Sequence, residues 1–291
     1  MKFIRALKQD LNKTLINSGF IAAALMTCVL GFTASAYVDP SIDKTYSIFE
    51  AFFTFDREFI EQNSDFASIT LFRSGLAGYV SMFIPIIVAF PFMVSFCAER
   101  NSGLMRFTVS RTGKYRYYLS KFFASFISGG LAVLLGMILF GMIVWIAFPS
   151  YTSYDMDPDM LEFIVGDGLL PTVSRHLLAS FLYGAFSTLP AFFISSFCKN
   201  PYIITCLPFM LTYVWSTAIN KLSASAFENM DFEFYDKIDP FRPDSVQRLA
   251  YIRFSDITPL QRNTLIFNSV YLTLLLAGFV IIMNMRTDKG N

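Results

Sequence analysis

The sequence predicts an all-α membrane protein with six transmembrane helices, from its composition and from its charge-free stretches. Of its 291 residues, 54% are hydrophobic and 15% are charged, whereas soluble domains carry about 25% charged residues. Six stretches contain no Asp, Glu, Lys or Arg, and each reaches the roughly 20 residues that a helix needs to cross a bilayer. Backbone groups in lipid must satisfy their own hydrogen bonds, so we expect helices rather than strands. The stretches are Thr14–Val38, Ser74–Ala98, Phe122–Tyr154, His176–Cys198, Asn200–Asn220 and Asn263–Met285.

The distribution of charge between these stretches predicts their orientation. With the N-terminus placed in the cytoplasm, the inside segments hold 13 Lys and Arg against three acids, and the outside segments hold 10 against 19. Basic residues near the ends of spans remain on the cytoplasmic side of a membrane. We therefore expect a multi-pass protein with both termini in the cytoplasm, including the tail 286–291. As its location we expect a bacterial plasma membrane.

The chain begins with a predicted interfacial helix over residues 1–17. Its apolar residues recur at helical spacing, and charged residues occupy the remaining faces. Such a helix lies along the inner leaflet, with its basic face toward lipid headgroups or a cytoplasmic partner. A cleaved signal peptide is the alternative, because Ala34-Ser35-Ala36 resembles a peptidase site. The apolar residues are Phe3, Ile4, Leu7, Leu11 and Leu15, and the charged ones are Lys2, Arg5, Lys8, Asp10 and Lys13.

Three long outside loops, 39–73, 150–175 and 221–262, are expected within a transmembrane domain of residues 18–285. The first contains seven acids, three bases and many aromatic residues. That mixture predicts a helix on the outer surface with its aromatic face in the membrane interface. The acidic run 155–159 lacks the glycine and the final Glu of a calcium-binding loop, so we expect a solvated turn there.

The substantial cytoplasmic loop is predicted at residues 99–121, with six basic residues and one acid in 23 positions. Gly103 and Gly113 allow turns around a short helix of about Leu104–Ser110. By contrast, the turn between the fourth and fifth spans is only Lys199-Asn200-Pro201. The simpler interpretation of the loop is that its basic residues anchor the chain on the cytoplasmic side. The order of its residues, however, favours a more specific role.

That order resembles the permease subunit of type-2 ABC exporters. The similarity lies in Glu99-Arg100-x-x-Gly103, a short apolar stretch, Ser110-Arg111 and a Tyr-rich approach to Lys121. The resemblance implies a coupling helix that docks in a groove on a separate ATPase subunit. It also implies two ATPase copies, which would bind ATP and Mg, and a second permease copy or paralogue. The docking element would then be formed or flanked by Glu99, Arg100, Gly103, Arg106, Ser110, Arg111 and Lys121.

Several other classes of protein are disfavoured by what the sequence lacks. It has no Gly-x-x-x-x-Gly-Lys-Ser/Thr loop, so it is not itself the ATPase. Its single histidine, His176, excludes a His-Glu-x-x-His zinc site within the chain, and we expect a solvated imidazole at the outer edge of a span. We predict no catalytic, cofactor-binding or metal-binding residues in this chain, and as partners we expect membrane lipids but no nucleic acid.

The residues inside the spans bear on what could pass between them. The sequence leaves open whether the segments rich in Phe and Met line an apolar pathway or face lipid. Prolines are expected to kink three of the spans; they are Pro85, Pro91, Pro190 and Pro208. An apolar passage suits an amphipathic or hydrophobic cargo such as a bacteriocin-like peptide, a drug or a lipid-like molecule. The alternative is a membrane-embedded sensory or binding subunit that transports nothing.

Overall fold

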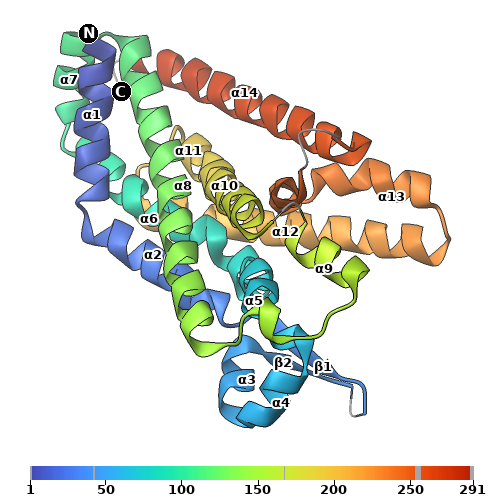
Figure 1. Ribbon diagram of the computed structural model, residues 1–291. Helices are drawn as coiled ribbons and strands as arrows, with labels where there is room; N and C mark the ends of the chain where they lie inside the picture. The colour runs from blue at the N-terminus through green and yellow to red at the C-terminus, as the bar shows by residue number, and fades with distance from the viewer. Residues whose placement is uncertain (1, 42, 167, 253–256, 289–291) are drawn as a thin grey trace.

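The computed structural model describes residues 2–41, 43–166, 168–252 and 257–288, and most of them are helical (Figure 1). Five of the described helical segments are long and apolar enough to cross a membrane, or up to six if one bent pair counts as a span. The predicted helical membrane fold is therefore confirmed. The long helices are α6 (Tyr79–Asn101), α8 (Lys114–Ala147), α10 (Leu169–Ser187) with α11 (Leu189–Ile194), α12 (Pro201–Glu228) and α14 (Pro259–Asp288).

The bent pair is α1 (Lys2–Leu15) followed by α2 (Ser18–Gly31), which meet at 61°. Asn17 separates them, and its side chain accepts a hydrogen bond from the Gly19 amide at the start of α2. The prediction of one continuous span over Thr14–Val38 was wrong in extent. With 14 residues, α2 is about 21 Å long at 1.5 Å per residue, which is less than a ~30 Å hydrocarbon core.

Residues after α2 form a hairpin of β1 (Ser35–Asp39) and β2 (Lys44–Ser47), which the all-helical prediction missed. Two backbone bonds attach the following helix to the end of α2, because the amides of Ile48 and Phe49 donate to the carbonyls of Ala34 and Phe32. The predicted surface helix of loop 39–73 is instead several short pieces. They are α3 (Ile48–Thr54), α4 (Arg57–Gln62), the 3-10 turn η1 (Ser64–Phe66) and α5 (Ser68–Ser74).

The opposite end of the molecule carries α7 (Leu104–Thr112), which joins α6 to α8. The first turns of α1 and the last turns of α14 lie at this same end, and the hairpin lies at the other (Figure 1). We call the two regions the α7 end and the hairpin end. Chain ends on one side are what an even number of membrane crossings requires.

The centre of the bundle is the close crossing of α8 with α10. A Cβ atom on Gly184 would lie 2.7 Å from the backbone oxygen of Gly129, so neither position has room for a larger side chain. Small residues at such crossings let helix backbones approach closely in membranes. The connection between α8 and α10 contains η2 (Tyr151–Ser153) and α9 (Pro158–Val165).

The helices extend beyond the apolar stretches that predicted them. α10 already begins at Leu169, and α12 continues to Glu228, inside the predicted loop 221–262. The fourth span is interrupted at Thr188, two residues before Pro190, where α10 ends and α11 begins. The loop before α14 folds as α13 (Phe232–Ile238), η3 (Asp239–Phe241) and η4 (Ser245–Tyr251). Of the predicted loops and tail, residues 42, 167, 253–256 and 289–291 lie outside the described residues.

Candidate functional site

The α7 helix is bounded by two glycines whose backbone conformation other residues rarely adopt. Gly103 has φ +75° and Gly113 has φ +91°, and a Cβ atom on either would meet nothing within 4 Å. The requirement for glycine is therefore conformational rather than steric. These turns fold α7 back between its neighbours, and the predicted short helix around Leu104–Ser110 is confirmed as Leu104–Thr112.

One side of α7 packs on the molecule and the other is exposed. Met105 and Val109, four residues apart, contact the hydrophobic core of the α7 end, to which Leu7 and Leu11 of α1 also contribute. On the other side Phe107 is 72% exposed, and Leu104, Arg106, Ser110 and Arg111 are exposed as well. A large aromatic ring and two arginines on one small surface are typical of a protein-binding site.

Beneath α7 a buried lysine ties three helices together. Lys121 of α8 is 4% exposed, and its Nζ lies 2.8 Å from Asp10 Oδ1 of α1 and 2.6 Å from Glu99 Oε2 of α6. Ser120 donates to the second oxygen of Asp10 at 2.6 Å, and Tyr117 donates to that of Glu99 at 2.9 Å. Both carboxylates are thus hydrogen-bonded on both oxygens, as buried charges require. We call these five residues the lysine cluster.

The last turn of α6 also holds the turn between α11 and α12. Arg100 is buried, and its guanidinium donates to the backbone oxygens of Ser195 and of Cys198, the latter at 3.0 Å. The neighbouring Asn101 donates to the backbone oxygen of Lys199 at 3.3 Å. These carbonyls follow the end of α11, where a helix leaves carbonyl groups unsatisfied. These hydrogen bonds connect the end of α6 to the turn that precedes α12.

The residues that the sequence grouped as one docking element thus fall into two sets. Arg106, Ser110 and Arg111 lie on the exposed side of α7, and Gly103 forms its first turn, whereas Glu99, Arg100 and Lys121 are buried. The buried three hold helices together and present no charged surface. Sequence reasoning missed Tyr117, which donates to Glu99, and Asp10, which accepts from both Lys121 and Ser120. Asp10 is the sole acid in α1. A single acidic residue in an otherwise basic amphipathic helix was the sequence feature that could have pointed to a buried ion pair.

A cavity of about 590 Å³ lies between α6, α10–α11, α12, α14 and η3, within the 300–1,000 Å³ of typical ligand pockets. Its walls are mainly aromatic and aliphatic, with Trp215, Phe267 and Leu275 among them, and Asn268 and Arg242 add polar groups. Trp215 donates its indole N–H to the backbone oxygen of Phe241 at 2.8 Å, which joins α12 to η3. Arg242 contributes to an ion-pair network with Asp244 and Asp239. Burial raises the pKa of Asp239, and the positive charges of Arg248 and Arg242 oppose that rise.

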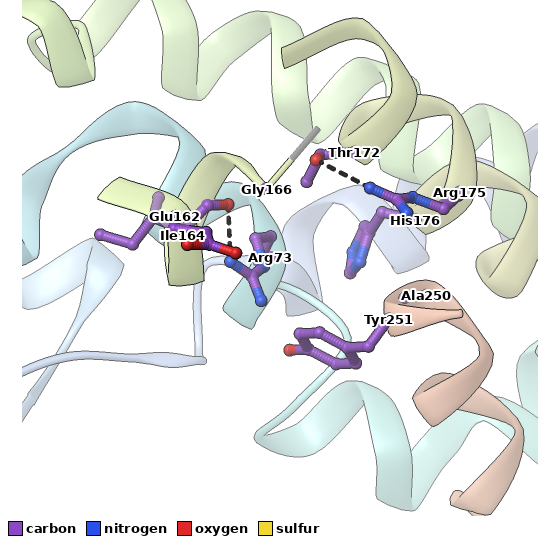
Figure 2. A pocket seen from close by; sticks show the side chains of 9 residues that line it. All are labelled: Arg73, Glu162, Ile164, Gly166, Thr172, Arg175, His176, Ala250 and Tyr251. Carbon is purple, nitrogen blue, oxygen red and sulfur yellow. Dashed lines mark hydrogen bonds between the residues drawn. The ribbon is translucent and has the colours of Figure 1, made fainter. Parts of the chain in front are cut away.

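The expectation of a solvated imidazole at His176 was wrong. The side chain is 4% exposed and its ring contacts the ring of Phe72 edge-on, with centroids 4.9 Å apart. The sequence places His176 at the edge of an apolar stretch but does not indicate that α5 and η4, from distant parts of the chain, cover it. His176 lines a smaller cavity near the hairpin end (Figure 2).

The structure is thus an apolar helical bundle in which α7 joins α6 and α8 at the end where the amphipathic helix α1 begins, and this architecture is that of a multi-pass membrane protein. Comparison with protein families agrees. The family described as ABC-2 family transporter protein matches residues 54–231, more than half of the chain, so the chain belongs to that family. It is a multi-pass permease subunit of an ABC transporter, and its family implies an ABC ATPase partner. No curated protein matched the chain significantly.

Proposed function

We propose that this chain is the permease of an ATP-driven exporter that moves an amphipathic or hydrophobic substrate. The observation that carries the proposal is α7, a short helix with an exposed arginine and phenylalanine surface that is connected through glycine turns to two long helices. We take the α7 end to be cytoplasmic, as the distribution of basic residues favours. The ATPase would then bind α7 and supply ATP and Mg²⁺.

The contacts beneath α7 give the proposed docking a physical consequence. Met105 and Val109 fix α7 to the core, and the lysine cluster joins α1, α6 and α8. A push on α7 would therefore move these three helices as one body, and Arg100 would pass part of that movement to the α11–α12 turn. The charges on the exposed side would set the register and the association rate of docking more than its affinity.

The cavity beside α12 and α14 supports the proposed class of cargo. Its walls are predominantly apolar, and its volume of about 590 Å³ suits a small amphipathic molecule or part of a peptide. α12 packs mainly on α6, whereas α14 packs on α11 and η3 and, within the described residues, makes no comparable contact with α6. Movement of α6 relative to α14 would change the size of the cavity, which is how ATP binding by an ATPase docked on α7 would act on cargo.

Two ATPase copies and a second permease, identical or paralogous, complete the proposed assembly. Large parts of α12 and α14 are exposed in the single chain, with apolar residues such as Val214, Trp215, Leu274 and Ile281 at the surface. Lipid or a second permease would cover these faces. A bacteriocin-like peptide, a drug or a lipid-like molecule would be carried outward.

The experiment that tests the proposal is gentle purification of the tagged chain from its native membrane, with identification of what accompanies it. We expect an ABC ATPase in stoichiometric amount and its ATP hydrolysis to drive transport. Arg106→Glu with Arg111→Glu should abolish coupling between hydrolysis and transport while leaving the membrane part folded. The matched control is Arg57→Glu with Arg262→Glu, which changes charge equally at exposed positions away from α7.

Unchanged transport in the Arg106 and Arg111 double variant would overturn the docking assignment. A chain that purifies with a non-ATPase partner, and whose ligand binding needs no nucleotide, would instead identify a sensory or binding subunit.

A further inference from the structure

A cavity of about 240 Å³ lies where α5, α9, α10 and η4 meet near the hairpin end (Figure 2). Its volume is below the 300–1,000 Å³ of pockets that hold whole drug-sized ligands, so it suits one charged group with a few attached atoms. The polar side chains that line it are Arg73, Glu162, Thr172, Arg175, His176 and Tyr251. The charged groups of this lining are thus two guanidinium groups and one carboxylate.

His176 is the residue that points to a ligand. Its side chain is 4% exposed, and neither Nδ1 nor Nε2 has a hydrogen-bond partner within the described residues. Buried polar groups in proteins nearly always have partners, and an orphaned one needs an explanation. Figure 2 shows the imidazole on the wall of the cavity, across from Arg73. A group inside the cavity is therefore positioned to bond to it.

The two arginines are held at different walls of the cavity by backbone oxygens. Arg73 donates to the oxygen of Ile164 at 2.7 Å, and its guanidinium lies 4.7 Å from the centre of the Tyr251 ring. Arg175 donates to the oxygen of Ile252 at 3.1 Å and to the hydroxyl of Thr172 at 3.4 Å. A guanidinium has five N–H donors in a planar fork that suits carboxylate and phosphate.

We propose that this cavity binds a phosphate group, either as free phosphate or as the headgroup of an anionic lipid. The hydrogen-bond donors of the cavity come from several walls. A tetrahedral phosphate directs acceptor oxygens toward several walls at once, whereas a planar carboxylate has only two oxygens, which lie in one plane. A metal ion does not fit, because the guanidinium groups repel cations and the described residues hold no cluster of three His, Cys, Asp or Glu side chains. The site does not depend on the proposed export function.

The test uses the purified full chain in detergent and follows its thermal unfolding. One arm compares sodium phosphate with sodium chloride and with sodium acetate at equal ionic strength. A second arm adds phosphatidylglycerol or phosphatidylcholine to the micelles. We expect a saturable rise in the unfolding midpoint with phosphate, with phosphatidylglycerol, or with both, since a ligand that binds the folded state stabilises it. A response to phosphate identifies the free ion as sufficient, and a response to phosphatidylglycerol alone identifies the lipid.

Two variants assign that response to the cavity. Arg175→Gln removes the guanidinium, and His176→Phe removes both ring nitrogens while keeping an apolar ring against Phe72. Each should weaken binding about tenfold to hundredfold, as expected for one hydrogen bond to a charged group. The control is Arg57→Gln, an exposed arginine on α4, which should bind as the natural chain does. If His176→Phe fails to fold, Arg175→Gln carries the assignment.

The proposal is overturned if no phosphate-bearing probe raises the midpoint beyond chloride and phosphatidylcholine, or if Arg175→Gln responds as fully as the natural chain. A response to acetate equal to that of phosphate would also overturn the assignment to phosphate.

Discussion

Replacing Lys121 by Met should destabilise the protein more than any exposed charge change, because it leaves two carboxylates without their shared cation. Lys121 Nζ lies 2.8 Å from Asp10 and 2.6 Å from Glu99, and the lysine side chain is 5% exposed. Removing one partner of a buried ion pair costs about 3–5 kcal/mol. At about 2–4 °C per kcal/mol, the unfolding midpoint should fall by about 6–20 °C.

Fluorescence-detected unfolding of the detergent-solubilised chain measures this change. Lys237→Met, which removes a lysine from an exposed pair with Glu233, is the matched control and should have little effect. Adding Asp10→Asn to Lys121→Met should recover part of the loss, because one of the two stranded charges is then removed. A midpoint for Lys121→Met equal to that of Lys237→Met would show that the lysine cluster does not hold the three helices together.

Two further changes test the packing and the cavity. Gly184→Ala should lower stability by about 1–3 kcal/mol in the same unfolding assay, because the alanine Cβ would lie 2.7 Å from the Gly129 oxygen. Helix propensity alone predicts the opposite, a gain in stability. A measured gain would therefore contradict the close crossing of α8 and α10. Leu275→Trp should fill the large cavity. In nanodiscs, an apolar diazirine probe should then label the Trp215 region about tenfold less, which corresponds to a loss of roughly 1.4 kcal/mol in the binding free energy of the probe. Leu274→Trp, at a neighbouring position that is 66% exposed, should leave labelling unchanged, and equal losses in both variants would refute the cavity as the labelled site.

The sequence was sufficient for features that depend on local residues. Charge-free stretches located the long helices, and Gly103 and Gly113 located the ends of α7, because a glycine at positive φ marks a turn whatever surrounds it. The hairpin escaped prediction because its two strands have five and four residues, too few for a periodic pattern to be distinguished from a loop.

Features that depend on distant residues could not be predicted. Lys121 and Glu99 are 22 positions apart and read as parts of a basic surface, yet helix geometry turns both inward, where Asp10 of α1 joins them. The burial of His176 likewise depends on Phe72 and on η4, which the sequence around it does not indicate. Counting charges predicts that a loop is basic, but it does not predict which charged residues are buried or which residues they pair with, because packing between distant helices determines both.

Arg100 imposes an order on the assembly of the molecule during synthesis. The lysine cluster is complete once residue 121 has been made, so α1, α6 and α8 can pair while the rest of the chain is still absent. The acceptors of Arg100 arrive only with Ser195, 95 residues after it. At about 5–20 residues per second, some 5–20 s pass in which the arginine has no such acceptors. The contacts of the lysine cluster can therefore form before α10 to α12 exist, whereas the bonds from Arg100 can form only after the turn between α11 and α12 has been made.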